Sequence, residues 1–119
     1  MGKKVMVVDD SPFMRVMIKD IVVKLGGVVV AEAGDGNEAV EKFTQFAPDV
    51  VTMDIVMPKK SGIDALSEIK QKQPGVKVVM ISAIDQKESL VQAIRLGASG
   101  FIVKPFDEEN VKLTLQKLL

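Results

Sequence analysis

The chain has 119 residues, which is enough for one domain with a buried core and too few for two. Its 16 lysine and arginine residues balance 16 aspartate and glutamate residues, so no positive field favours nucleic acid as a direct partner. The sequence has no cysteine and no histidine, which excludes disulfides, thiol or histidine catalysis and ordinary zinc sites. Carboxylates, hydroxyls and lysine remain as reactive groups, and oxygen-rich sites suit a hard cation such as magnesium.

The apolar residues occur in short, interrupted runs. No run approaches the roughly 20 residues that a membrane-spanning helix needs. The start of the chain leads directly into a strand-like segment and lacks the apolar core of a signal peptide. We therefore expect a soluble cytoplasmic protein with no membrane partner.

The first half of the chain alternates strand-like and helix-like segments. Apolar runs at residues 4 to 8, 28 to 31 and 50 to 53 predict strands that are buried on both faces. After the first run, Ser11-Pro12 suits the start of a helix, and Gly26-Gly27 suits its end. A second helix is predicted from apolar residues at helical spacing, namely Ala39, Phe43 and Phe46.

The second half repeats this alternation, with strand-like runs at residues 77 to 81 and 100 to 103. Helical spacing marks a segment with Ile63, Leu66 and Ile69, and a last segment with Val111, Leu115, Leu118 and Leu119. Gly97 suits a helix end, while Pro48, Pro58 and Pro74-Gly75 fall in connections. The pattern predicts a single three-layer α/β domain over residues 1–119, with five parallel strands, five helices and right-handed crossovers.

Polar residues stand where the apolar runs stop. Asp9 and Asp10 follow the first run, Asp54 the third, Ser82 the fourth and Lys104 the fifth. Because the carboxyl ends of parallel strands share one edge of a sheet, these side chains should converge where open α/β sheets bind ligands. Lys104 precedes Pro105, and the Lys104–Pro105 bond is a candidate for the cis form, which fixes a tight turn.

Simple electrostatics suggests a metal in such a pocket. At separations of about 5 Å and an effective dielectric near 20, each pair of carboxylates repels by roughly 3 kcal/mol, or about 10 for all pairs. A single lysine only balances this repulsion, whereas a divalent cation contributes about twice as much, so we predict that the pocket binds Mg²⁺. An aspartate beside the metal can act as a nucleophile toward phosphorus, with a hydroxyl and a lysine holding the transferred oxygens.

These residues resemble the receiver domain of two-component response regulators, and the likeness covers the whole chain. The matching blocks are Val-Val-Asp9-Asp10-Ser-Pro-Phe-Met-Arg, Val-Thr-Met-Asp54-Ile-Val-Met-Pro, Ile-Ser82-Ala and Val-Lys104-Pro105-Phe. The chain most resembles the single-domain chemotaxis members, although the receiver of the chemotaxis methylesterase has a similar first block. The resemblance implies a flavodoxin-like, doubly wound sheet with strand order 2-1-3-4-5.

The resemblance also implies a role for each site residue. Asp54 would accept the phosphoryl group, and Ser82 and Lys104 would hold its oxygens. Asp10, Asp54 and the backbone carbonyl of Val56 would bind Mg²⁺ directly, and Asp9 would bind it through water. Phe101 would be the aromatic switch residue, whose ring moves inward when Ser82 moves toward the phosphoryl group.

The implied function is a phosphorylation switch that turns over no external substrate. A histidine kinase would donate the phosphoryl group, and an output partner would bind the surface of the fourth helix, fifth strand and fifth helix, with a flagellar motor switch protein as one candidate. Val56 and Ile84 are apolar where many members carry polar or acidic groups that orient an attacking water. We therefore predict slow self-dephosphorylation.

Other functions are also compatible with parts of this pattern. A haloacid-dehalogenase-type phosphatase uses the same set of groups, but it places its nucleophile after the first strand in an Asp-x-Asp arrangement, whereas here the lone aspartate follows the third run. The chain could also be the receiver piece of a larger regulator, either a transcription factor or a chemotaxis methylesterase.

Overall fold

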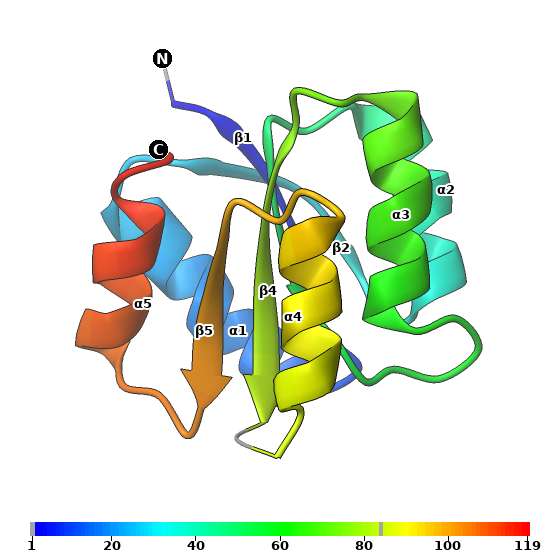
Figure 1. Ribbon diagram of the computed structural model, residues 1–119. Helices are drawn as coiled ribbons and strands as arrows, with labels where there is room; N and C mark the ends of the chain where they lie inside the picture. Colours follow the sequence, from blue (N-terminus) through cyan, green and yellow to red (C-terminus); the bar gives the residue numbers. More distant parts are fainter. Residues whose placement is uncertain (1, 84) are drawn as a thin grey trace.

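The computed structural model describes residues 2–83 and 85–119, in which five strands alternate with five helices (Figure 1). The strands are β1 (Lys4–Val8), β2 (Val28–Ala33), β3 (Val50–Asp54), β4 (Lys77–Ala83) and β5 (Gly100–Lys104). The helices are α1 (Pro12–Lys24), α2 (Gly36–Phe46), α3 (Gly62–Lys72), α4 (Lys87–Arg95) and α5 (Glu108–Leu115). Each strand-like run of the sequence is a strand, so the predicted alternation is confirmed.

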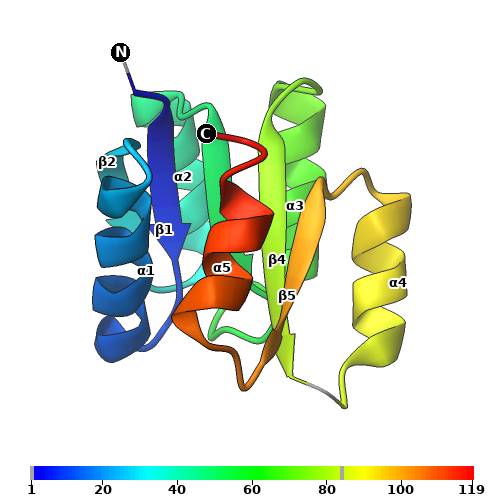
Figure 2. The same cartoon turned by 90° about the vertical axis from the view of Figure 1, so that its left-hand side faces the viewer.

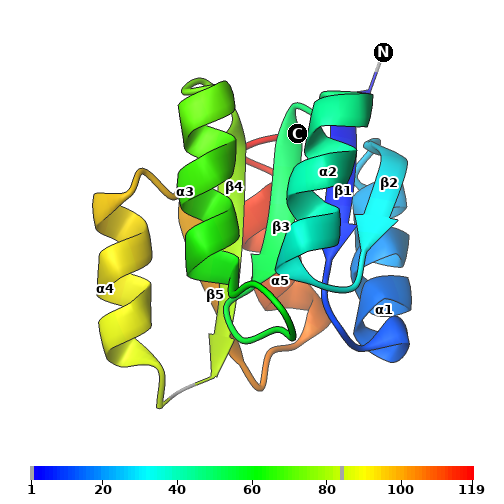
Figure 3. The ribbon, with the colours of Figure 1, turned by 90° about the vertical axis from the view of Figure 1, so that its right-hand side faces the viewer.

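The strands form one sheet in the order β2-β1-β3-β4-β5, and every neighbouring pair is parallel. This order confirms the doubly wound, flavodoxin-like fold. Because β1 lies between β2 and β3, the direction of winding reverses at β1, and the carboxyl ends of β1 and β3 flank the crevice where such sheets bind ligands. Helices α1 and α5 cover one face (Figure 2), and α2, α3 and α4 lie on the other (Figure 3).

Side chains on both faces are buried in the central strands β1, β3 and β4, as the apolar runs predicted. The same prediction is wrong for most of β2 and β5, which are only partly buried because each lies at an edge of the sheet. Alternate residues of a strand point to opposite faces, so Val50 packs toward α1 and α5 while Val51 packs toward α2 and α3. The core therefore consists of two apolar clusters, one on each face of the sheet. The helices α1 and α5 contribute Ile18, Ile21, Val22, Val111 and Leu115 to one cluster, and α2 and α3 contribute Ala39, Phe43, Ile63, Leu66 and Ile69 to the other. The three-layer packing therefore holds the sheet from both sides.

The helix ends follow the capping signals of the sequence. The Oγ of Ser11 accepts a hydrogen bond from the backbone N–H of Met14 at 3.3 Å, and Pro12 is the first residue of α1. Gly26 and Gly97 follow the ends of α1 and α4 with φ of 88° and 99°, a conformation that glycine adopts without a steric penalty.

Two helical patterns differ from the sequence prediction in detail. Phe46 lies on the same stripe as Ala39 and Phe43, but it is 38% exposed because it is the last residue of α2. Helix α5 ends at Leu115, yet Leu118 still packs against the core, and its N–H donates to the carbonyl of Leu115 in a tight turn at 2.9 Å. In the described part of the chain, no helix has both the length and the apolar character needed to cross a bilayer.

Candidate functional site

The polar residues at the strand ends meet at one edge of the sheet, which points downward in Figure 1. Asp9 and Asp10 follow β1, and Asp54 is the last residue of β3. One carboxylate oxygen from each of these three residues lies within 4.8 Å of the others, close to the separation assumed from the sequence. The sheet order therefore brings together acids that are more than forty residues apart in the chain.

Lys104 provides the positive charge of this cluster. It is the last residue of β5, and its Nζ lies 3.3 Å from Oδ2 of Asp54 and 3.7 Å from Oδ2 of Asp9. The peptide bond between Lys104 and Pro105 is cis. A single ammonium thus contacts both buried carboxylates.

Burial makes the ionised form of both carboxylates unfavourable. Asp9 is 1% exposed and Asp54 is 7% exposed. Burial raises the pKa of Asp9, and the N–H of Ser11 and the charge of Lys104 only partly offset this rise. Burial also raises the pKa of Asp54, the negative charge of Asp9 raises it further, and Lys104 opposes both effects. Without another cation, the cluster is short of positive charge.

The two carboxylate oxygens of Asp9 have different surroundings. Its Oδ1 accepts a hydrogen bond from the backbone N–H of Ser11 at 2.9 Å, whereas its Oδ2 is buried and has no hydrogen-bond partner among the described residues. A buried carboxylate oxygen without a partner is costly, and a metal ion is one way to satisfy it. Three carboxylates without nitrogen or sulfur ligands suit a hard divalent cation, so the residues fit Mg²⁺.

Ser82 lies near the carboxyl end of β4, close to this cluster, whereas Phe101 lies near the amino end of the neighbouring strand β5, in register with Met80. Ser82 is 1% exposed near the end of β4, and Phe101 is 48% exposed on β5. Val56 lies two residues beyond Asp54 with a side chain that is 60% exposed, so it borders the site without filling it. Ile84, the other apolar position noted in the sequence, lies outside the described residues.

Residues 5–116 match the family model of the response regulator receiver domain. The chain belongs to this family. It is 49% identical to the chemotaxis protein CheY of Thermotoga maritima, over 99% of this chain and 98% of that protein. It is 50% identical to the CheY of Bacillus subtilis, over 100% of this chain and 99% of that protein.

A solved structure of the same family also superposes closely on this receiver domain. The crystal structure of the CheX–CheY–BeF3–Mg²⁺ complex from Borrelia burgdorferi matches it with a TM-score of 0.91 and 36% identity. The match covers 97% of this chain and 87% of that chain. The family's fold is therefore shared in three dimensions as well as in sequence.

Sequence reasoning missed Arg15, which fixes the backbone of the acidic pair. Its Nη1 donates to the carbonyl oxygen of Asp9 at 2.6 Å, and its Nε donates to Oε1 of Glu32 at 3.0 Å. The only signal was its place in α1, one turn after the cap residue Ser11. The contact to Glu32 on β2 depends on the tertiary fold and could not be read from spacing.

Sequence reasoning also missed the importance of Gly62 for the strand that carries Asp54. The N–H of Gly62 donates to the carbonyl of Ile55 at 2.7 Å, and a Cβ at Gly62 would lie 2.0 Å from the carbonyl oxygen of Asp54. Only a residue without a side chain allows α3 to start this close to β3. The glycine thus sets the distance between the connecting loop and the site.

Proposed function

We propose that this receiver domain is a phosphorylation switch that accepts a phosphoryl group on Asp54 from a histidine kinase. The observation that carries the proposal is the environment of the Asp54 carboxylate. It lies at the end of a central strand, is 7% exposed, and has the Lys104 ammonium 3.3 Å from Oδ2. An accessible but largely desolvated carboxylate beside a cation suits a nucleophile for phosphoryl transfer.

In the transfer, a carboxylate oxygen of Asp54 forms a bond to phosphorus while the bond from phosphorus to the donor's imidazole nitrogen breaks. The electron pair of that bond leaves with the imidazole. Lys104 neutralises charge on the phosphoryl oxygens, and the Ser82 hydroxyl donates a hydrogen bond to one of them. Bound Mg²⁺, held by Asp9, Asp10, Asp54 and the carbonyl of Val56, would neutralise further charge on the same oxygens. The chain catalyses its own modification in this scheme and turns over no external substrate.

The phosphoryl group would act by shifting an equilibrium between inactive and active conformations. Movement of Ser82 toward the phosphoryl oxygen would make room for the Phe101 ring, which is 48% exposed in this structure. The surface of α4, β5 and α5 would then bind the output partner. The full-length similarity to chemotaxis proteins supports a role in chemotaxis, with a flagellar motor switch protein as one candidate partner.

The test is incubation with Mg²⁺ and a small phosphodonor such as acetyl phosphate, followed by intact mass spectrometry. The wild type should gain the mass of one phosphoryl group, and chelation of the metal should suppress the gain. Asp54→Asn should gain none, and Asp10→Asn should gain little. Equal labelling of wild type and Asp54→Asn, or no labelling of the wild type, would contradict the proposal.

We further propose that hydrolysis of the phosphorylated form is slow. Val56 is apolar and 60% exposed at the rim, so its side chain cannot orient an attacking water. Val56→Asn should shorten the half-life of the phosphorylated form by at least about tenfold, because a positioned polar group assists water attack. Val23→Asn is a matched control, since Val23 is 63% exposed on α1. A wild-type half-life of a few seconds would refute slow hydrolysis.

A further inference from the structure

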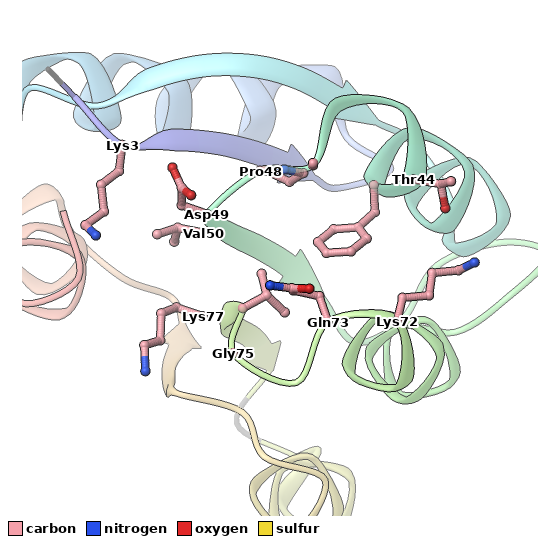
Figure 4. Close-up of a pocket in the computed structure, with 12 residues that line it drawn as sticks. Lys3, Thr44, Pro48, Asp49, Val50, Lys72, Gln73, Gly75 and Lys77 are labelled. Atoms are coloured by element: carbon pink, nitrogen blue, oxygen red, sulfur yellow. The ribbon is translucent and has the colours of Figure 1, made fainter.

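A cavity of about 510 Å³ lies at the amino edge of the sheet, the end opposite to Asp54 (Figure 4). It is bordered by the start of β3, the start of β4 and the carboxyl-terminal ends of α2 and α3. Its volume lies within the roughly 300–1,000 Å³ typical of small-molecule sites. Neither the phosphoryl chemistry nor the output surface uses this end of the molecule.

The floor of the cavity is apolar and firmly packed. Phe43, Val50 and Val76 are 5%, 0% and 3% exposed, and each also belongs to a core cluster. Pro48, which precedes β3, is buried beside them. These side chains come from separate elements and are held by the core, so the floor is preformed.

The rim of the cavity carries an excess of positive charge. Lys3, Lys72 and Lys77 line it, against a single carboxylate from Asp49. Oδ2 of Asp49 already accepts a hydrogen bond from the backbone N–H of Lys4 at 2.9 Å. Within the described residues, none of the three rim lysines takes part in an ion pair.

The rim charges are distributed unevenly around the opening. Figure 4 shows Lys3 and Lys77 on one side, with Asp49 and Val50 between them, and Lys72 on the opposite side. The apolar floor lies between these groups. A ligand that spans the cavity would therefore meet an apolar surface at its centre and ammonium groups at its ends.

We propose that this cavity is a binding site for a small organic anion with a flat apolar body. The body would lie on Ala47, Gly75 and the exposed edges of Phe43 and Val76, and a carboxylate, sulfonate or phosphate group would lie between Lys3 and Lys77. The excess of lysines over carboxylates favours an anion over a neutral or cationic ligand. The site is independent of the proposed phosphorylation of Asp54.

Gly75 offers a way to block the cavity without disturbing the fold. It lines the cavity, a Cβ added there meets no heavy atom within 4 Å, and its φ lies outside the left-handed range. Gly75→Leu should therefore add bulk at the border of the cavity while the chain folds normally. Circular dichroism and the denaturation midpoint verify that the variant is folded.

The probe is anilinonaphthalene sulfonate, which combines an aromatic body with one negative charge. Its affinity is measured by fluorescence titration, and its location by amide chemical-shift changes in NMR spectra of the labelled chain. Neutral phenylnaphthylamine is the uncharged comparison. Lys3→Gln/Lys77→Gln removes the charges, and the same loss of charge at exposed Lys87, near the opposite edge of the sheet, serves as a control.

We expect the sulfonate to shift the amides of Gln73, Gly75 and Lys77. Its affinity should fall at least about tenfold in Gly75→Leu and in the double lysine variant, and stay unchanged in Lys87→Gln and Asp54→Asn. Neutral phenylnaphthylamine should bind at least about tenfold more weakly. Unaltered affinity in Gly75→Leu, equal binding of the neutral probe, or a dimer in sedimentation that Gly75→Leu dissociates would each overturn the proposal.

Discussion

Asp9 and Asp10 are neighbours in the chain, but their environments differ. Asp9 is 1% exposed and has one oxygen without a hydrogen-bond partner among the described residues, whereas Asp10 is exposed to solvent. Because β1 ends at Val8, the first acid is still held in the sheet layer while the second already lies in the loop. Burial therefore raises the pKa of Asp9 and makes its ionisation costly in the metal-free chain.

Asp9→Asn should change both the stability of the metal-free chain and its stabilisation by Mg²⁺. The amide keeps an oxygen for the N–H of Ser11 and removes the buried charge, whose pKa is raised mainly by burial, so the metal-free chain should gain stability at neutral pH. Mg²⁺ should stabilise this variant less than it stabilises the wild type, because one of the acidic groups is lost. Denaturant unfolding in chelator and in excess Mg²⁺ measures both effects.

Asp10→Asn is the matched control for this prediction. It should lose much of the stabilisation by Mg²⁺ but gain little stability without the metal, because its carboxylate is already hydrated. If Asp9→Asn destabilised the chain in chelator, then the attraction between Asp9 and Lys104 would outweigh the cost of burial.

At the scale of elements, the loop that follows Asp54 is fixed by the first residues of two helices. The N–H of Gly36, at the start of α2, donates to the carbonyl of Lys60 at 3.1 Å. The N–H of Gly62, at the start of α3, donates to the carbonyl of Ile55 at 2.7 Å. Both glycines lie where a Cβ would overlap the partner backbone, so the loop is held by close backbone contact.

Gly62→Ala should therefore damage both stability and phosphorylation. The methyl group would overlap the carbonyl of Asp54, and we expect a loss of up to about 3 kcal/mol together with slower labelling of Asp54. Gly75→Ala is the control, since its Cβ meets open space, and its stability should stay within about 0.5 kcal/mol of wild type. Wild-type stability and labelling in Gly62→Ala would show that the loop adjusts freely.

A second element-scale prediction concerns the contact between α1 and β2. Glu32 accepts from Lys19 at 2.7 Å and from Arg15 at 3.0 Å, and the bond from Lys19 contributes most to lowering its pKa. The ionised form thus stabilises the fold above the ordinary pKa of 4.5, and this contribution is lost as the pH falls through the lower folded pKa. Since the side chain is 40% exposed, the effect is only about 0.5 kcal/mol.

Glu32→Gln should lower stability by that amount at neutral pH and match the wild type in acid. Urea unfolding over a pH series measures the difference, and Glu41→Gln on exposed α2 surface is the control. A difference that persisted unchanged into acid would mean that packing and not charge is responsible.

The sequence was sufficient to predict features that depend on local pattern. The strand runs, the cap at Ser11 and the strand-end position of Asp54 each follow from a few neighbouring residues. The bond from Arg15 to the carbonyl of Asp9 and the contact of Gly62 with β3 depend on how separate elements pack, and the pattern does not contain this information. The cavity beside Phe43 escaped prediction for the same reason.

At the scale of the whole molecule, one sheet is shared by two apolar clusters. Val5 and Val7 contribute to one cluster, and Met6 and Val8 contribute to the other, so every central strand belongs to both. Loss of either helical layer would expose the face that it covers to water, on strands whose other face still packs against the second layer. The domain should therefore unfold in one cooperative transition.

Matched substitutions on the two faces test this cooperativity. Leu66 of α3 and Leu115 of α5 are both fully buried, and each belongs to a different cluster. Leu66→Ala and Leu115→Ala should each cost about 2–5 kcal/mol and shift a single transition. Separate transitions by circular dichroism and by NMR in either variant would indicate that the layers unfold independently.

The alternation of side chains along the strands has a consequence for how a group on Asp54 would be held. Counting back to Ile102, Lys104 projects from the face covered by α1 and α5; counting back to Met80, Ser82 projects from the opposite face. Phe101 lies on the same side as Ser82. A phosphoryl group on Asp54 would thus lie between the two faces of the sheet. On one face Lys104 already contacts Asp54 and would hardly move, so the movement toward the phosphoryl group would come from Ser82 on the other face.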